Sequence, residues 1–132
     1  MKDPRWITTE ALQLMHVRQL ELFGGRHGIL DQNAMESALH KARNLNAYEP
    51  DSDIAALASA YLVGFAQKQV FADGNKRTAL AAALIFLRLN GHELNISKDE
   101  LLAFVLGVAR NELDQSAAAK WLRLRITPLR EA

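Results

Sequence analysis

The chain has 132 residues, 49% hydrophobic and 23% charged, which suits one globular domain covering residues 1–132. A formal net charge of +1 gives no reason to expect nucleic acid or an anionic membrane as a partner, and the basic residues form no stripe with interleaved aromatic residues. Because the chain has no cysteine, disulfides and thiolate metal sites are excluded, which fits a reducing cytoplasm.

The first third of the chain predicts two helices and a loop. Thr8 is a candidate N-cap of a helix that ends at Gly24–Gly25, and Asp31 can cap a second helix ending near Arg43. Asn44–Asp51 has no apolar period and contains a proline, so we expect a loop of about eight residues there. The residues expected to face inward are Leu12, Met15, Gln19, Leu22, Phe23, Ala34, Met35, Ala38 and Leu39.

Two apolar segments follow in the middle of the chain. Residues 54–65 carry apolar side chains at helical spacing and predict an amphipathic helix that leads into Gln67–Gln69. Residues 79–89 are apolar nearly all round, so this helix is expected to be the buried centre of the core. It is too short to span a membrane, which needs roughly 20 residues. Because Met1–Arg5 is followed by no apolar signal segment, we expect a cytoplasmic protein.

The last third predicts two more helices. Ser97–Glu100 has the form of a capping box before an apolar stripe, and Asp114 can cap a last helix over Ala117–Ile126. The only strand candidate is the short segment Glu93–Ile96. The fold class predicted is therefore all-α, a compact bundle of about six helices around the helix at Ala79–Leu89.

The loop before that central helix carries the chemistry. Asp73 and Gly74 form a turn signal, and a buried helix presents free N–H groups at its first turn. Lys76 and Arg77 in that turn oppose the helix dipole, so they need a compensating anion or an acidic neighbour. This conflict favours a phosphate-binding site. Asn75 fits either a helix cap or part of the anion site.

The stretch Phe71–Ala79 resembles the signature of the Fic/Doc superfamily, and specifically of its Doc (death-on-curing) toxin branch. That signature runs His, any residue, Phe, any residue, Asp or Asn, Gly or Ala, Asn, Lys, Arg. Gln69 stands at the position of its histidine. Further segments resemble Doc landmarks in the same order along the chain, namely Phe23–Gly25, Gly28–Asp31, Glu36–Leu39, Asn46–Glu49 and Leu87–Gly91.

The resemblance implies a Fic/Doc-like fold, with ATP and Mg²⁺ as ligands. It places Mg²⁺ on Asp73, since one carboxylate and phosphate oxygens suit this cation. Lys76 stands where AMP-transferring Fic enzymes carry glycine, so the implied reaction is transfer of the terminal phosphate to a protein hydroxyl. Phe71, as an aromatic residue before a buried helix, is expected to anchor the binding loop in the core. The nucleotide-binding residues implied are Phe71, Gly74, Asn75, Lys76 and Arg77, and the catalytic ones are the residue at position 69, Asp73, Lys76 and Arg77.

Gln69 bears directly on activity. In the family, histidine accepts the proton of the attacking hydroxyl, whereas an amide cannot hold a proton at neutral pH. We therefore expect this chain to bind nucleotide but to turn over poorly. Two histories fit Gln69, a natural loss and a deliberate His→Gln change that allowed a toxic protein to be produced. The intact remainder of the signature favours the second.

The remaining histidines are not expected to substitute for the missing base. His16 and His40 lie on predicted helices and are expected to be partly exposed, and His27 and His92 lie in predicted loops. Their spacing suggests no metal cluster.

The resemblance further implies partners. A cognate antitoxin would supply an inhibitory helix, because the chain lacks the internal inhibitory motif of many Fic proteins. The target would be a host protein with a Ser or Thr hydroxyl, a translation factor being what the family suggests. The segment before the helix at residues 54–65 would form a flap over the site. The alternatives are nucleotidyl transfer of the Fic type and a non-catalytic nucleotide- or protein-binding module on the same fold.

Overall fold

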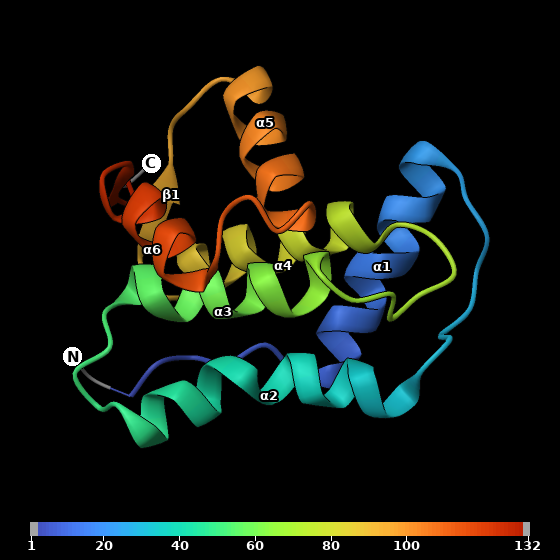
Figure 1. Cartoon of the computed structure of the whole chain (residues 1–132), viewed down its shortest axis with the longest axis horizontal. Coiled ribbons are helices and arrows are strands. Elements are labelled where there is room, and N and C mark those ends of the chain that lie inside the picture. The colour runs from blue at the N-terminus through green and yellow to red at the C-terminus, as the bar shows by residue number, and fades with distance from the viewer. Residues whose placement is uncertain (1–2, 131–132) are drawn as a thin grey trace.

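The structure is a computed structural model that describes residues 3–130. Six helices and two short strands follow one another along residues 3–130. Figure 1 labels the helices and β1. In order, they are α1 (Thr9–Phe23), α2 (Gln32–Tyr48), α3 (Ile54–Ala66), α4 (Asn75–Leu89), β1 (His92–Leu94), α5 (Lys98–Ala109), α6 (Gln115–Arg123) and β2 (Ile126–Pro128). This mostly helical architecture confirms the predicted fold class.

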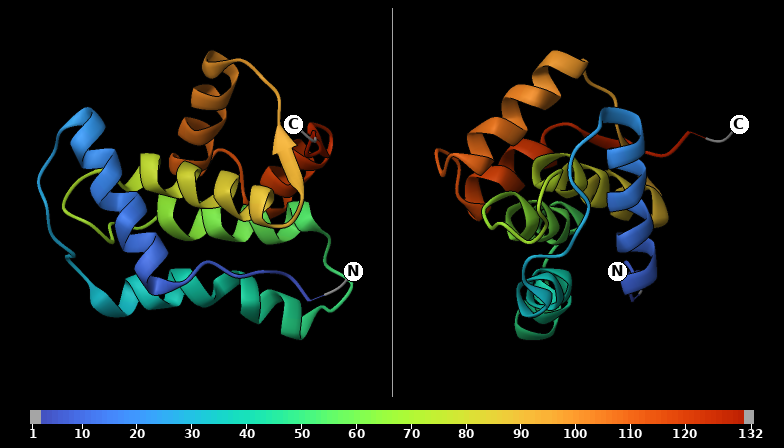
Figure 2. Two further views of the ribbon diagram at one scale, coloured as in Figure 1. Left: turned by 180° about the vertical axis from the view of Figure 1, so that it is seen from behind. Right: turned by 90° about the vertical axis from the view of Figure 1, so that its right-hand side faces the viewer.

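Helix α3 is the centre of the bundle. It packs against α2, α4, α5 and α6, and Figures 1 and 2 show α2 on one side of it and α4 on the other. Every residue from Leu57 to Ala66 is buried. A Cβ atom built on Gly64 would lie 3.3 Å from that of Ala38, so the backbones of α2 and α3 approach closely there.

The expectation that residues 79–89 form the most buried helix is therefore wrong. Helix α4 packs one face against α3 and leaves Ile85 and Leu89 about 40% exposed on the other. The physical reason is visible in the two sequences. Helix α3 has no charged residue and its non-apolar positions are small, so every face can be covered by a neighbouring helix. Helix α4 has charged residues at both ends.

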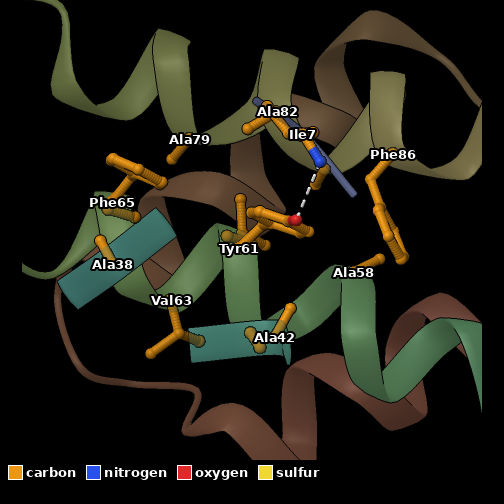
Figure 3. Close-up of a cluster of buried hydrophobic side chains, with 14 of the residues drawn as sticks. Ile7, Ala38, Ala42, Ala58, Tyr61, Val63, Phe65, Ala79, Ala82 and Phe86 are labelled. Atoms are coloured by element: carbon orange, nitrogen blue, oxygen red, sulfur yellow. Dashed lines mark hydrogen bonds between the residues drawn. The ribbon is translucent and has the colours of Figure 1, made fainter. Parts of the chain in front are cut away.

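Aromatic side chains fill the space between α3, α4 and the N-terminal segment. Tyr61 is fully buried, and its ring lies 5.0 Å from that of Phe86 (Figure 3). The Tyr61 hydroxyl accepts a hydrogen bond of 3.2 Å from the Ile7 backbone N–H, and burial raises the pKa of this hydroxyl. The segment before α1 is thereby fixed to the core.

Helix α2 continues through Tyr48, so most of the loop predicted at Asn44–Asp51 is helical. Leu45 packs against the core and holds the last turn of α2 in place, although asparagine on either side of it has a low helix propensity. Only residues 49–53 connect α2 to α3.

The predicted N-caps are confirmed, but the C-terminal boundaries differ from expectation. The side chains of Thr8, Asp31, Ser97 and Asp114 each accept a hydrogen bond from a backbone N–H of the first turn. The last helix ends at Arg123 because Ile126–Pro128 pair with His92–Leu94 in an antiparallel two-stranded sheet. No helix in the described part of the chain combines the length and the apolar character that crossing a bilayer requires.

Asp53 joins the start of α3 to α6. Its carboxylate caps α3 through the Ala56 N–H (2.9 Å) and forms a two-point ion pair with the Arg123 guanidinium. The hydrogen bond to Arg123 is the main reason that the pKa of Asp53 is lowered below 3.8. The contribution of this pair to stability is therefore complete above about pH 4 and is lost as the pH falls through the lowered pKa.

We predict that Asp53→Ser, which keeps a capping oxygen, costs about 0.2–1 kcal/mol at pH 7, because both partners are half-exposed. Asp53→Ala also removes the cap and should cost roughly 1 kcal/mol more. Urea unfolding at pH 7 and pH 3 measures both effects. The difference in unfolding free energy between the parent and Asp53→Ser should be smaller at pH 3 than at pH 7. An equal difference at both pH values would contradict a stabilising Asp53–Arg123 ion pair.

Candidate functional site

Helix α4 begins without a side-chain cap. Gly74 is its N-cap residue, at φ +80° and ψ +17°, and no side chain accepts a hydrogen bond from the N–H groups of the first turn. This left-handed conformation is accessible to glycine at little cost. In the described part of the chain, the first-turn N–H groups of α4 are thus left available to an anion.

The side chain of Asn75 folds back onto the loop instead of capping α4. Its Oδ1 accepts hydrogen bonds from the N–H groups of Val70 (3.0 Å) and Phe71 (2.9 Å). Its Nδ2 donates to the Phe71 carbonyl at 2.9 Å. The interpretation of Asn75 as a cap is therefore wrong: the side chain fixes the loop conformation and leaves the helix terminus open.

An open cavity of about 620 Å³ lies at this helix terminus. Such a volume is typical of small-molecule sites. The polar part of its wall comes from the motif, which is the signature stretch Gln69–Arg77. The apolar part comes mainly from α5. The lining includes Gln69, Asp73, Gly74, Asn75, Lys76, Arg77, Leu80, Leu102, Val105 and Leu106. The structure therefore brings together all the predicted site residues except Phe71.

Phe71 is fully buried, in agreement with the predicted core anchor. Its ring stacks on that of Phe65 in α3, with a centroid separation of 6.4 Å, and it does not line the cavity. Its role in the structure is therefore to hold the loop in position.

Two cations stand at the mouth of the cavity. Lys76 and Arg77 are exposed, and the first turn of α4 contains no acidic residue. The Arg77 guanidinium lies over the Phe23 ring, 4.4 Å from its centroid. The cations therefore lack a carboxylate in their own turn, which is the local conflict expected from the sequence.

The nearest acidic residue along the chain, Asp73, has another partner. Its Oδ2 accepts a hydrogen bond of 2.6 Å from the Arg26 N–H and lies 3.4 Å from the Arg26 Nε. The backbone N–H of Arg26 is the main cause of the lowered pKa of Asp73, so this carboxylate is ionised at neutral pH and loses these bonds only as the pH falls through that lowered value.

Within residues 3–130, the hydrogen bonds that the Asp73 carboxylate accepts all go to Oδ2. Oδ1 is left for a cation. One carboxylate oxygen, phosphate oxygens and waters suit Mg²⁺, so Asp73 fits the predicted metal role. No cluster of three or more His, Cys, Asp or Glu side chains that could hold a metal by itself occurs in the described residues.

The segment that covers the motif loop is Gly28–Asp31, not the predicted Asn44–Asp51. Ile29 and Phe71 form an antiparallel bridge, and the N–H groups of Leu30 and Asp31 donate to the Val70 carbonyl. Figure 1 shows the α1–α2 and α3–α4 connections side by side at one end of the molecule. The family resemblance alone suggested Asn44–Asp51 as the flap, and most of this segment instead continues α2.

Gly25 and Arg26 were also missed as site residues. Gly25 (φ +123°) allows Asp73 and Leu20 to approach, since a Cβ atom there would lie 3.0 Å from both the Asp73 Cβ and the Leu20 Cδ2. The glycine-rich spacing of residues 24–28 was a signal for this close approach, but nothing in the sequence indicates its partner.

We predict that Gly25→Ala lowers stability because the new methyl group pushes on Leu20 and Asp73, and lowers affinity for ATP with Mg²⁺ because Asp73 is displaced. Gly28→Ala is the matched control, since Gly28 has a similar φ of +127° with no atom within 4 Å of a built Cβ. Both changes strain the backbone. Overpacking should lower the free energy of unfolding by about a further 1–3 kcal/mol in Gly25→Ala alone. Urea unfolding and calorimetry measure the two effects, and equal losses in the two variants would contradict the contact.

The four histidines only partly match expectation. His40 is exposed on α2 and His27 is exposed in a loop, whereas His92 is half-buried in β1. His16 was predicted to be partly exposed but is 5% exposed and faces the motif loop, so that prediction is wrong. Of the α1 positions expected to face inward, Leu12 and Met15 are buried, whereas Leu22 and Phe23 are exposed. The buried face of α1 is completed by His16 and Leu20.

Gln69 is exposed and lines the cavity beside the uncapped helix terminus. A group at this position can meet a hydroxyl brought to a phosphate on α4. The Gln69 amide can orient such a hydroxyl by a hydrogen bond but cannot retain its proton.

Comparison with known proteins agrees with this geometry. The model of the Fic/DOC family matches residues 6–87, which contain α1 to α3 and nearly all of α4. The chain is 35% identical over 119 residues to the protein kinase doc of Escherichia phage P1, covering 90% of this chain and 94% of that protein. It is 33% identical over 104 residues to toxin Doc of Mycolicibacterium smegmatis, covering 73% of this chain and 78% of that protein. These matches show that the chain belongs to the Fic/DOC family, and within it to the Doc branch.

Proposed function

We propose that the active form of this protein is a Doc-type toxin that transfers the terminal phosphate of ATP to a hydroxyl group of a host protein. The observation that carries the proposal is the cavity at α4, where an uncapped helix terminus, two cations and an ionised carboxylate meet. The printed names of the two relatives, a protein kinase and a toxin, support the reaction class and the biological role.

The arrangement of the site supports the following reaction. The hydroxyl oxygen of the target attacks the terminal phosphorus, a new O–P bond forms, and the bond from this phosphorus to the oxygen of the ADP leaving group breaks. In the active form, with histidine at position 69, the hydroxyl proton passes to that imidazole. The first-turn amides of α4, Lys76 and Arg77 hold the phosphates and offset their charge. Mg²⁺, when bound, would neutralise further phosphate charge, and Asp73 is the residue that would hold it.

With Gln69 at the proton-accepting position, we infer that this chain binds ATP but turns it over slowly. Phosphoryl transfer depends mainly on positioning and electrostatic stabilisation, which the motif retains. The general-base contribution, typically 10²–10⁴-fold, is what the substitution removes. Gln69 is also the observation that favours the second candidate, a binding module that keeps the fold without the reaction.

The proposal includes a cytoplasmic toxin–antitoxin pair that arrests growth by modifying a host protein, with a translation factor as the target class. A partner helix could lie on apolar side chains that α1 and α4 leave exposed. Leu14 is 71% exposed on α1, and α4, which packs on α1, exposes Ile85. Calorimetric titration with the peptide or protein encoded beside this gene tests the pairing, and absence of binding in the micromolar range would remove it.

The reaction itself is tested with a Gln69→His version and ATP labelled on either the α- or the γ-phosphate. Label from the γ-phosphate should appear on protein in a lysate, and label from the α-phosphate should not. Transfer of the α-label would instead support nucleotidyl transfer. If neither label is transferred and growth is not arrested, the binding module is the better account.

A further inference from the structure

His16 is a buried polar side chain that contacts the phosphate-binding turn from another helix. Its ring stacks on that of Phe71 with centroids 3.7 Å apart and planes 12° apart. Its Nε2 lies 2.9 Å from the backbone oxygen of Asp73, a residue 57 positions away in sequence. Helix α1 is thus fixed to the residue immediately before the N-cap of α4.

The geometry assigns the hydrogen in this contact. A carbonyl oxygen can only accept, so the Nε2 of His16 carries the hydrogen and donates it to Asp73. Because the peptide group is planar and trans, a carbonyl turned toward His16 directs the N–H of Gly74 the opposite way, away from α1. His16 therefore fixes the orientation of the peptide group from which α4 begins.

Packing alone does not account for a histidine at this position. Burying a polar ring is unfavourable unless it is hydrogen-bonded, and an apolar side chain would fill the same space. Apart from the Tyr61 hydroxyl, which bonds the Ile7 N–H, three polar side chains are buried within residues 3–130, namely His16, Ser59 and Thr78. Ser59 bonds within its own helix and the Thr78 hydroxyl has no partner, so of these three only His16 connects two distant segments.

We propose that His16 is a positioning residue, which rests on the proposed phosphate site. By holding the Asp73 carbonyl, it keeps the Asp73 carboxylate and the first-turn amides of α4 in their binding geometry before the nucleotide arrives. His16 does not replace the missing base, because its ring is covered and its Nε2 is engaged by Asp73.

Two substitutions separate the hydrogen bond from packing in the full-length chain. His16→Phe keeps an aromatic ring against Phe71 but has no donor. His16→Gln loses the stacking but places an amide N–H donor at about the reach of Nε2. The control is Leu12→Ala, which destabilises α1 from another buried position.

Affinity for ATP with Mg²⁺ is measured by calorimetry on all variants, and stability by urea unfolding. We expect His16→Phe to weaken binding about tenfold, the amount that one buried hydrogen bond supports, and His16→Gln to recover most of it. Leu12→Ala should lower stability with unchanged affinity. Unchanged affinity in folded His16→Phe, or an equal loss in His16→Gln, would overturn the proposal.

A measurement without nucleotide keeps the inference separate from the proposed function. The imidazole ¹⁵N shifts of His16 in the parent should report a protonated Nε2, and His16→Phe should shift the Gly74 and Asn75 amide signals. If the parent does not bind ATP, the proposed function fails, but these shifts still show whether His16 donates a hydrogen bond to the Asp73 carbonyl. A ring protonated only on Nδ1 would overturn the inference even if His16→Phe did not fold.

Discussion

Restoring histidine at position 69 is expected to raise the rate of phosphate transfer by roughly 10²–10⁴-fold, with little change in ATP affinity. The reason is that Gln69 lines the cavity without contributing charge, whereas a histidine there can take the proton of the attacking hydroxyl. Single-turnover transfer from γ-labelled ATP measures the rate, and calorimetry measures the affinity.

The matched control is Gln67→His, the same change two residues earlier. Gln67 also lines the cavity, but its Nε2 donates to the Val108 carbonyl at 3.1 Å, so this side chain is turned to α5. Only the change at position 69 should restore transfer. Equal rates in the two variants, or no gain from Gln69→His, would show that position 69 does not hold the proton acceptor.

Removing the Arg77 guanidinium is expected to weaken binding of ATP with Mg²⁺ by roughly ten- to a hundredfold. A charge-assisted hydrogen bond contributes about 1.5–3 kcal/mol, and Arg77 can contact two phosphate oxygens at once. In the structure this side chain lies on the Phe23 ring at the mouth of the cavity, so binding needs only a side-chain movement.

Arg88→Ala is the control, because Arg88 is exposed on the same helix in its last turn. The two variants have equal net charge, so a long-range electrostatic effect would weaken binding in both. Calorimetry at two salt concentrations measures the difference. Similar affinities for the two variants would mean that the phosphates do not lie at the first turn of α4.

Much of the local structure could be predicted because its causes are local. Thr8, Asp31, Ser97 and Asp114 cap the helices that follow them because a short oxygen-bearing side chain beside an apolar period satisfies free N–H groups in any tertiary setting. The turn at Gly74 is likewise encoded in adjacent residues. The grouping of Asp73, Gly74, Lys76 and Arg77 around one cavity follows from the same short stretch.

What could not be predicted depends on contacts between distant segments. The end of α2 is set by Leu45 packing on the core, and the burial of α3 by small residues that admit neighbouring helices on all sides. His16 was expected at the surface because the apolar pattern of α1 allows this side chain to face either the solvent or the core. Only the fold reveals that Phe71 and Asp73 lie beside it.

The residues that line the candidate site could therefore be predicted, but the contacts that hold them in place could not. The sequence identifies the charged and turn-forming side chains that line the cavity, since charge and turn chemistry are local properties. It does not indicate that Asn75 holds the loop, that Arg26 holds Asp73, or that Gly28–Asp31 covers Val70. The contacts of Arg26 and of Gly28–Asp31 join segments that meet only in the folded chain, whereas those of Asn75 reach four or five residues back.

The most direct test of the account is a titration of the ¹⁵N-labelled protein with ATP and Mg²⁺ followed by NMR. The account predicts that the amide signals of Gly74 to Arg77 shift most and become protected from exchange, and that Arg77→Ala reduces these changes. A folded protein whose signals in this turn stay unchanged at millimolar ATP would contradict the phosphate site, and with it the proposed phosphotransferase.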